Sequence, residues 1–513
     1  MKRAFYPFLL SIYPVLALLA FNISEMKPVE ALRALLATLA GGILLFMILK
    51  LVMRNTEKAA LVFAIVWVLF FSYGHVYHFL EQTLLFGMNL GRHRLLMPLW
   101  AILLGAGLWW VLSRRGNLVN LTTAMNTIAI VLLVFPLVQI TSAEIRAQSA
   151  WSQARSVSAA NGALQLASGQ TPPDIYYIIL DAYARDDVLQ ETFTYDNSPF
   201  LEQLEALGFY VAHCTMSNYA QTELSLASSL NFDYLQALIE DFSPSSTDRS
   251  PLWPLIKKSA TRQMLEEIGY QTVAFETGYN WIKWEDADVY LVPDSKVGGL
   301  SAFEVIVVES SAGLILTDAA SVLPKFLVPD ISYPKQKQRE RILSTLDNLA
   351  HLPNSVDSPK FVYAHIIAPH DPFVFDQQGE WVNFSGPMDD ATFQAGYRDE
   401  LIYLNQRVIE VMEKIIRNSA TPPVIIIQGD HGHGRSSSED RMKILNAYYL
   451  PGVDAQLLYP SITPVNTFRV VLDQYFGAHF ELLEDKSYFS IYDSPYQFHE
   501  IPNNCEITGS SNP

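Results

Sequence analysis

Apolar positions follow two different patterns in the front and the back of the chain. Five apolar windows fall in the first 140 residues, each near the length of about 20 residues that crosses a bilayer. They are 5–21, 35–53, 59–79, 95–112 and 124–140, of which the first and last are short. Behind them, short apolar runs alternate with amphipathic stretches. These patterns predict an α-helical transmembrane bundle of about five helices, followed by an α/β domain with a mainly parallel sheet.

The same patterns predict the boundaries of four parts. They are a transmembrane domain at 1–141, a juxtamembrane linker at 142–172, the α/β domain at 173–489 and a polar tail at 490–513. The linker is rich in Ala, Ser, Gln and Asn and ends at two prolines, which favours a short helix and then a flexible tether. Region 297–334 shows no obvious site and is interpreted as an insertion or lid.

Three apolar runs in the α/β part end in residue types that bind metals. An uninterrupted Val/Ile run is typical of a strand buried on both faces, and ligand sites in such sheets lie beyond the carboxyl ends of the strands. The end residues are Asp181 after 175–180, His370 and Asp371 after 361–367, and Asp430, His431 and His433 after 424–427. If these strands are neighbours, their carboxylates and imidazoles can converge on one divalent cation. For the GDHGHG stretch alone, an ordinary solvated turn is an equal alternative.

Three of these features together resemble a known family. They are Asp181 after the first strand, the loop APHDPF at 368–373, and the late strand that ends in GDHG at 429–432. They resemble the sulfatase-like branch of the alkaline phosphatase superfamily over residues 173–489, and the layout is similar to membrane-anchored lipoteichoic acid synthases and phosphoethanolamine transferases. The resemblance implies a sulfatase-like fold and one divalent metal ion, which would be Mn, Zn, Mg or Ca. It also implies the metal ligands Asp181, Asp430 and His431.

The resemblance further implies a catalytic hydroxyl, located between the first metal aspartate and the later Asp-His pair. Thr222 is the matching position, and the spacing of the leucines that follow predicts a helix beginning near Gln221. Backbone N–H groups at such a helix start favour a developing anion. The alternative is that Thr222 caps the helix, and Ser217 and Ser225 are the other candidate hydroxyls.

Four more side chains are candidates for contact with the substrate. His370 matches the histidine that contacts phosphoryl or sulfuryl oxygens in the relatives and is predicted to be catalytic. His433 is predicted to assist it or to be an extra ligand. Trp281 and Trp284 are predicted to grip a sugar or glycerol headgroup, and the alternative is an edge packed by indoles for structural reasons.

By resemblance, the protein is a membrane-anchored enzyme that moves phosphoglycerol or phosphoethanolamine through a covalent threonine intermediate. Membrane lipids and surface glycans or lipids would be its substrates. Hydrolysis of a phosphoester or sulfate ester by the same fold is the alternative. Formylglycine chemistry is disfavoured because neither cysteine is followed by the required Pro and Arg. A catalytically inactive envelope scaffold or sensor is the alternative of a different class.

Charge and cysteine content bear on partners and compartment. The net charge of −17 argues against nucleic acid as a partner. With five helices, the basic residues at 2–3, 50–58 and 114–115 fall on one side, which predicts a cytoplasmic amino terminus and an extracytoplasmic catalytic domain in an inner or plasma membrane. Cys214 and Cys505 either pair or remain free thiols. The oligomeric state stays open.

Overall fold

The computed structural model describes most of the chain as two units. The described residues are 3–23, 26–81, 84–85, 88–114, 116, 118–157, 164, 171–239, 243–294, 299–318, 333–382, 384 and 388–505. One compact unit is Met1–Ile145 with Lys296–Pro334, and the other is Arg146–Ser295 with Lys335–Pro513. Lys2 and Arg115, which contribute to the predicted orientation, lie outside the described residues, as do parts of the predicted linker and tail.

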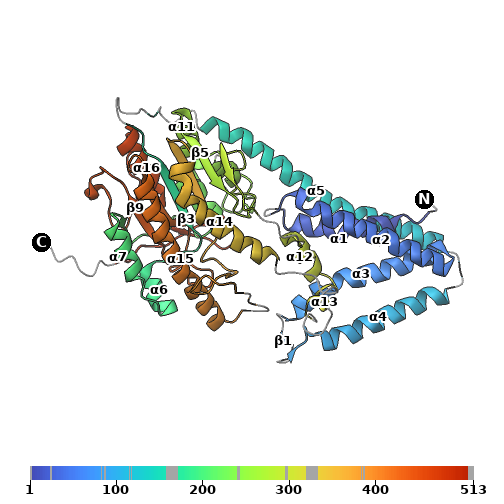
Figure 1. Ribbon diagram of the computed structural model, residues 1–513. Coiled ribbons are helices and arrows are strands. Elements are labelled where there is room, and N and C mark those ends of the chain that lie inside the picture. Colours follow the sequence, from blue (N-terminus) through green and yellow to red (C-terminus); the bar gives the residue numbers. More distant parts are fainter. Residues whose placement is uncertain are drawn as a thin grey trace. The chain divides into compact units, whose positions relative to one another are not determined.

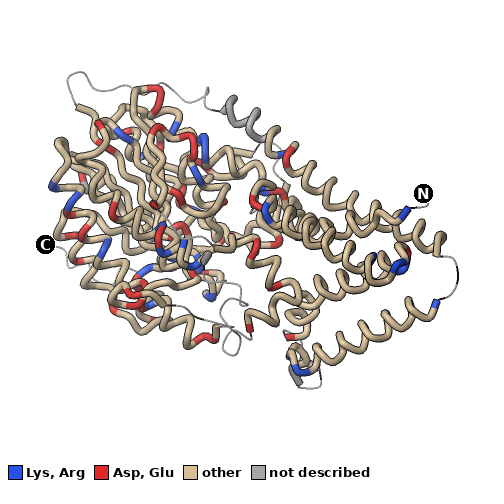
Figure 2. Tube along the Cα trace, turned by 45° about the vertical axis from the view of Figure 1, so that its right-hand side comes forward, with Lys and Arg blue, Asp and Glu red and all other residues tan. Residues whose placement is uncertain are grey.

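The first unit is built from apolar helices (Figure 1). Its elements are α1 Tyr6–Phe21, η1 Pro28–Ala31, α2 Leu32–Met53, α3 Thr56–Glu81, β1 Leu84–Leu85, β2 Met88–Asn89, α4 His93–Ser113, α12 Ala302–Glu309 and α13 Leu314–Asp318, together with the part of α5 Val119–Val157 up to Ile145. Among the described residues, four helices are long and apolar enough to cross a membrane, and α1 is a shorter apolar helix. Figure 2 shows that charged residues gather near the helix ends. The predicted transmembrane bundle is therefore confirmed.

Helix α5 continues well beyond the last apolar window. It runs for 39 residues, so no break occurs at residue 142, where the linker was predicted to begin. The sequence from residue 142 to 157 contains Ala, Glu, Gln and Arg but no Gly or Pro, and such a composition favours continued helix. The membrane helix and the predicted juxtamembrane helix are therefore one element.

The second unit contains a seven-stranded sheet with the order β4-β9-β8-β3-β7-β5-β6. Strand β9 is antiparallel to β8 and β4, and the other pairs are parallel. The strands are β3 Ile175–Leu180, β4 Tyr210–Val211, β5 Gln271–Phe275, β6 Val289–Leu291, β7 Lys360–Ile366, β8 Val424–Gly429 and β9 Asn446–Tyr449, with a separate ribbon of β10 Tyr488–Phe489 and β11 His499–Glu500. The prediction of an α/β domain with a mainly parallel sheet is confirmed.

Helices cover both faces of this sheet. They are α6 Asp186–Phe193, α7 Ser198–Ala206, α8 Thr222–Ser229, α9 Leu235–Leu238, α10 Leu252–Lys257, α11 Ala260–Glu267, α14 Tyr333–Ser355, α15 Asp390–Asn418, η4 Ala455–Leu457 and α16 Pro464–Phe476. One apolar core lies under α6, α7, α14 and α15, and the other lies under α8, α10, α11 and α16. Because both faces are covered, β3, β7 and β8 are buried along their whole length, which explains their unbroken apolar sequences.

The three strands that carry the sequence motifs are neighbours. Strand β3 lies between β7 and β8, and Leu180 pairs with both Ile366 and Gly429. Asp181 and Asp430 are the next residues along β3 and β8, so they emerge at the same edge of the sheet. The predicted convergence of the strand ends is therefore present.

A disulfide joins two distant parts of this unit. Cys214 and Cys505 are bonded across a sequence separation of 291 residues, with their Cα atoms 5.5 Å apart. Cys214 follows β4 and precedes helix α8, while Cys505 follows β11. The bond attaches the C-terminal part of the chain to the segment that leads to Thr222.

Candidate active site

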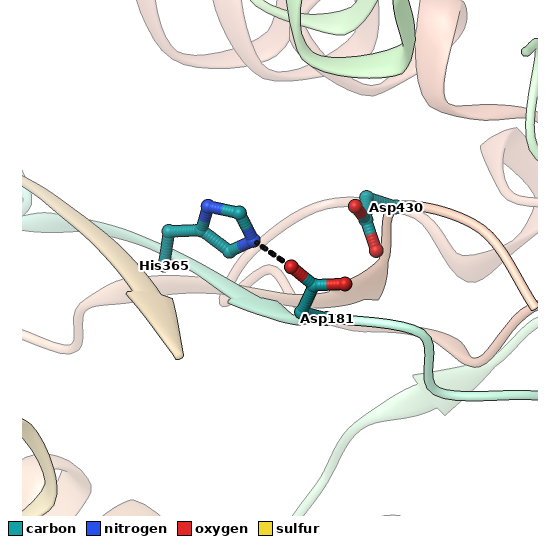
Figure 3. A group of neighbouring side chains, drawn as sticks. All are labelled: Asp181, His365 and Asp430. Atoms are coloured by element: carbon teal, nitrogen blue, oxygen red, sulfur yellow. Dashed lines mark ion pairs between the residues drawn. The ribbon is translucent and has the colours of Figure 1, made fainter. Parts of the chain in front are cut away.

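Two carboxylates and one imidazole meet at the carboxyl edge of the sheet (Figure 3). Asp181, His365 and Asp430 each place a donor atom within 4.8 Å of the others, and all three are buried. His365 Nε2 lies 3.1 Å from Asp181 Oδ2. Sequence reasoning missed His365, although it was an ionisable residue inside a buried apolar strand. An ionisable side chain in a buried strand needs a polar partner, so a histidine within this apolar run could have indicated a polar site.

Two carboxylate oxygens of this group have no hydrogen-bond partner. These atoms, Asp181 Oδ1 and Asp430 Oδ2, are fully buried. The other Asp430 oxygen accepts hydrogen bonds from the backbone N–H groups of Ala182 and His431, at 3.0 Å each. A buried carboxylate oxygen without a partner is costly. Both unpartnered oxygens therefore suit a cation.

His431 completes this arrangement. Its Nε2 lies 3.4 Å from Asp430 Oδ2 and 3.8 Å from Asp181 Oδ1, the same two oxygens that lack partners. Its Nδ1 lies 2.9 Å from the Gly432 carbonyl, which fixes Nδ1 as the protonated nitrogen and leaves a lone pair on Nε2. Donor atoms about 2.1 Å from one tetrahedral zinc ion stand about 3.4 Å apart. Both distances from His431 Nε2 are near this spacing, and two carboxylate oxygens with one imidazole nitrogen are suitable ligand types for one divalent cation.

Thr222 lies beside the same nitrogen. Its Oγ1 is 3.0 Å from His431 Nε2. Thr222 is the first residue of α8, and Gln221 occupies the N-cap position, so the capping alternative does not describe Thr222. Its side chain is partly exposed, whereas Ser217 and Ser225 are buried. Of the three candidate hydroxyls, Thr222 is the one that contacts His431.

A buried ion pair holds the first turn of α8 in place. The Arg249 guanidinium donates to Glu223 Oε2 at 2.7 Å and to Gln221 Oε1 at 2.5 Å. The Trp253 indole donates to the other Glu223 oxygen at 3.2 Å. Arg249 and Glu223 side chains are only 5% and 7% exposed, so the pair is shielded from solvent. These contacts fix both neighbours of Thr222 in the sequence.

Arg441 is a cation that sequence reasoning missed. Its Nη1 donates to the Gly432 carbonyl and its Nε to the Ala220 carbonyl, each at 2.9 Å. Its Nη2 lies 3.2 Å from His431 Nε2. The hydrogen-bond acceptors of Nε and Nη1 are neutral carbonyls, and the carboxylates of Asp181, Asp371 and Asp430 act on the guanidinium only through their charge. Nη2 therefore suits an anionic substrate group. Burial lowers the pKa of His431 to about 4, and Arg441 contributes to the shift.

His370 approaches the site from the loop after β7. Its ring centroid lies 6.2 Å from that of His431, and its Nδ1 lies 2.5 Å from the Asp371 carbonyl. Burial lowers the pKa of His370, but the carboxylates of Asp181 and Asp371 outweigh burial and raise it above the ordinary value. The side chain is 30% exposed, so a substrate can reach it. A protonated imidazole there suits the role of general acid.

The family model described as Sulfatase matches residues 173–469, more than half of the chain. The chain belongs to the sulfatase family. This membership confirms the resemblance to the sulfatase-like branch that the sequence motifs indicated.

Several solved structures are similar to this sulfatase-family chain. The C-terminal periplasmic domain of EcEptC from Escherichia coli is 11% identical, with a TM-score of 0.42 over 65% of this chain and 94% of that chain. Lipooligosaccharide phosphoethanolamine transferase A (EptA) from Neisseria meningitidis is 13% identical, with a TM-score of 0.37 over 92% and 96%. BT1596, a 2-O GAG sulfatase, is 12% identical, with a TM-score of 0.38 over 62% and 72%. No curated protein matches the sequence.

His433 packs among aromatic side chains of the sulfatase-family domain. The side chain is buried, and its ring lies edge-on to Phe193 at 4.8 Å between centroids, with Phe393 and Tyr397 also in contact. Neither ring nitrogen has a hydrogen-bond partner, and burial lowers the pKa of His433 to about 4. Its predicted contact with the substrate stays a prediction.

The two predicted headgroup-binding tryptophans pack against the domain core. Trp284 is 0% exposed and stacks on Tyr363 at 4.5 Å between ring centroids, with the Arg262 guanidinium 4.9 Å from its ring centroid. It therefore offers no exposed surface to a substrate, and the structural alternative describes it better. Trp281 is half-buried against the same core.

We expect Asp430→Asn to lose the bound divalent ion, because the substitution replaces a charged donor with a neutral amide. The measurement is the metal-to-protein ratio of the purified protein by elemental mass spectrometry. Asp196→Asn is the matched control, since Asp196 is exposed and is not a member of the buried group of Asp181, His365 and Asp430. An unchanged ratio in Asp430→Asn would show that the group in Figure 3 does not hold the ion.

A second prediction concerns Glu400, a fully buried residue of α15 that anchors the loop after His370. Glu400 Oε2 accepts from the backbone N–H groups of Val374 and Phe375 at 2.6 and 3.2 Å, and Oε1 has no partner. Burial raises the pKa of Glu400 to about 8. In the folded protein, the Glu400 carboxyl therefore stays protonated up to about pH 8. In the unfolded chain, the same carboxyl loses its proton above its ordinary pKa of 4.5. The free energy of unfolding therefore falls as the pH rises from 4.5 to about 8.

We expect Glu400→Gln to remove this loss. Between pH 6.5 and 8, the wild type should lose up to about 1.4 kcal/mol of unfolding free energy per pH unit relative to the variant. Thermal or denaturant unfolding at several pH values measures the difference. Glu413→Gln, on an exposed part of the same helix, should follow the wild type. Parallel pH profiles for wild type and Glu400→Gln would contradict the shifted pKa.

Proposed function

We propose that the protein is a metal-dependent transferase that moves a phosphoryl-linked headgroup from a membrane lipid to an envelope glycan or lipid. The headgroup would be phosphoglycerol or phosphoethanolamine, and Thr222 would carry it as a covalent intermediate. The observation that supports this proposal most directly is the contact of 3.0 Å between Thr222 Oγ1 and His431 Nε2, next to two unpartnered carboxylate oxygens. An inactive scaffold has no need for such costly buried atoms.

Asp181, Asp430 and His431 are the residues that would hold the ion. When bound, a divalent ion lowers the pKa of a nearby hydroxyl and neutralises charge on the transferred group. His365 contacts the second oxygen of Asp181 at 3.1 Å, so we assign it to orienting that carboxylate. Although burial raises the pKa of Asp181, His370, His365 and His431 together hold it below its ordinary value. Asp181 is therefore ionised and ready to act as a ligand.

The reaction proceeds in two displacements at phosphorus. In the first, Thr222 Oγ1 releases its proton to solvent and attacks, and the bond from phosphorus to the lipid alcohol breaks. His370 donates its proton to that leaving oxygen. In the second, neutral His370 accepts the proton of the acceptor hydroxyl as it attacks, and Thr222 leaves and is reprotonated. The products are the lipid alcohol and the modified acceptor.

Two groups stabilise the negative charge of the transferred phosphoryl. Arg441 directs Nη2 toward the site while its other nitrogens are held by main-chain carbonyls. The backbone N–H groups in the first turn of α8 lie next to the nucleophile and carry the positive end of the helix dipole. Such fixed donors are among the largest contributions to catalysis of group transfer.

The membrane helices favour a lipid donor and an outward-facing site. Attachment to the bilayer gives the catalytic domain a high effective concentration of lipid substrate. Helix α1 packs between its neighbours through buried Tyr6, Leu10, Val15 and Leu19, which supports five crossings in total. The Cys214–Cys505 disulfide supports an oxidising, extracytoplasmic compartment. We therefore place the protein in the inner or plasma membrane with the catalytic domain outside.

The test of this function is the mass of the Thr222 peptide after the full-length protein is incubated with native lipids. We expect an added mass equal to the transferred headgroup phosphate. Thr222→Ala should lack this mass and lose turnover while its metal content stays at the wild-type level, and Thr194→Ala should behave as wild type. Normal turnover in Thr222→Ala would show that another hydroxyl is the nucleophile.

We further expect Arg441→Gln to lower kcat/KM by about 100-fold to 1,000-fold, as removal of a fixed charge-stabilising donor does elsewhere. The measurement is turnover of a phospholipid donor in detergent or nanodiscs. Arg435→Gln is the matched control, because Arg435 lies on the same loop but pairs with exposed Asp390. Equal losses of kcat/KM in both variants would show that Arg441 does not specifically stabilise the transferred group.

A further inference from the structure

An excursion of 20 residues, at 299–318, leaves the catalytic part of the sequence and packs with the membrane helices. The compact unit formed by the N-terminal helices includes Lys296–Pro334, although the residues before and after this range belong to the catalytic unit. The excursion carries helices α12 and α13. Ser301 and Glu304 form a capping box that fixes the start of α12. Figure 1 shows both helices at the left-hand ends of the N-terminal helices, beside α1 and α3.

The start of the excursion is held by charge and by apolar contact. Arg33 of α2 forms an ion pair with Glu304, and its Nη2 also donates to the Gly299 carbonyl at 2.7 Å. The Glu304 side chain is only 9% exposed, so its charge depends on this partner. Next to it, Phe303 is 0% exposed. The apolar cluster around Phe303 also contains Val15, Leu19, Ala31 and Ala34.

The end of the excursion is held by α3 and α4. The backbone N–H of Ala312 donates to the Phe70 carbonyl at 2.7 Å. A Cβ atom on Gly74 would come within 2.1 Å of the Glu309 carbonyl oxygen, so glycine permits this close approach. Asp318 Oδ2 lies 2.7 Å from Nε2 of His93, the first residue of α4.

These contacts reach into the apolar part of the bundle. Phe70 stands 11 residues before Glu81, the last residue of α3, which is about 16 Å along a helix. Phe70 also lies within the uncharged apolar window at 59–79. Residues 309–312 therefore contact α3 inside its apolar stretch rather than at its end.

The excursion is itself apolar, and part of its surface faces away from the bundle. No charged residue occurs between Glu304 and Glu309 of α12, where the sequence is VIVV. Ile306 is partly exposed, and Leu316 of α13 is 40% exposed. The membrane helices beside it expose many large apolar side chains as well, including Leu36, Phe70 and Leu103. The excursion and the apolar helices that it contacts thus both expose large apolar side chains.

We propose that residues 299–318 form a re-entrant element whose outer apolar side chains contact the acyl chains of the bilayer. The proposal concerns membrane contact and does not depend on the reaction assigned above. It also changes how the catalytic unit is attached. The chain passes between the two units near residues 145, 295 and 334, so the attachment has three connections rather than one linker.

The experiment places a spin label on the full-length protein in phosphatidylethanolamine/phosphatidylglycerol nanodiscs. The two native cysteines are bonded to each other, so a cysteine introduced at Leu316 supplies a free thiol. Power saturation compares collisions with oxygen, which concentrates in lipid, and with a water-soluble nickel chelate. Leu103→Cys in α4 is the lipid control, and Leu482→Cys in the catalytic unit is the matched aqueous control. These two leucines are 44% and 45% exposed.

We expect the oxygen-to-nickel accessibility ratio at position 316 to match that at 103 and to exceed that at 482 several-fold. A ratio at 316 equal to that at 482 would overturn the proposal, because the segment would then lie in water.

A second variant tests whether the close contact at Gly74 holds residues 299–318 against α3. In the Leu316→Cys background, Gly74→Ala should displace the segment and raise nickel accessibility at the label. Gly105→Ala on α4 is the matched control, because a Cβ atom there meets nothing within 4 Å. If Gly74→Ala leaves the accessibility at 316 unchanged, the close contact with α3 does not seat the excursion.

Discussion

The parallel pairing of β8, β3 and β7 is the constraint on which the catalytic domain depends. With β3 in the centre, the residues that follow β3 and β8 must emerge side by side, whatever the length of chain that separates them. Asp181 and Asp430 are 249 positions apart in the sequence and still share one site. A shift of one residue in either pairing would turn a carboxylate toward the opposite face of the sheet. The apolar sequences of the strands therefore fix the chemistry at their ends as well as the core.

Burial of this site has two consequences that oppose each other. It strengthens every electrostatic interaction among Asp181, His431 and Arg441, and it makes each unpaired oxygen costly. The domain compensates with fixed partners around the edge, such as the pair of Arg249 and Glu223 beside Thr222. The partners are fixed by the surrounding fold, so the polar groups are arranged before a substrate arrives. Rigid polar surroundings of this kind suit transfer of a highly charged group.

The sequence predicted the sheet and the main residues of the candidate site because their signals are local. Buried strands show as apolar runs, and Asp181 and Asp430 stand directly after two of them, while Thr222 is the first residue of helix α8. The signals for His365 and Arg441 were weaker. His365 interrupts a strand that otherwise reads as core, and Arg441 comes 10 residues after His431, beyond a polar loop. Only the folded chain brings the Arg441 guanidinium back to that histidine.

The excursion at 299–318 was not predicted as a membrane element for a related physical reason. Its apolar stretch is far shorter than the roughly 20 residues that mark a spanning helix. Its packing depends on features of other segments, such as Arg33 and Gly74, which carry no local sign of their purpose. Contacts of this kind follow from tertiary structure and leave no periodic pattern in the sequence.

The disulfide has a consequence for the order in which the protein matures. Cys505 comes after every strand of the seven-stranded sheet, while Cys214 lies eight positions before Thr222. The segment leading to Thr222 can therefore be secured only after the whole domain has been synthesised and has met oxidising conditions. A chain whose last residues are still missing would have its strands but lack this covalent closure, so the position of the segment before Thr222 depends on the final residues of the domain.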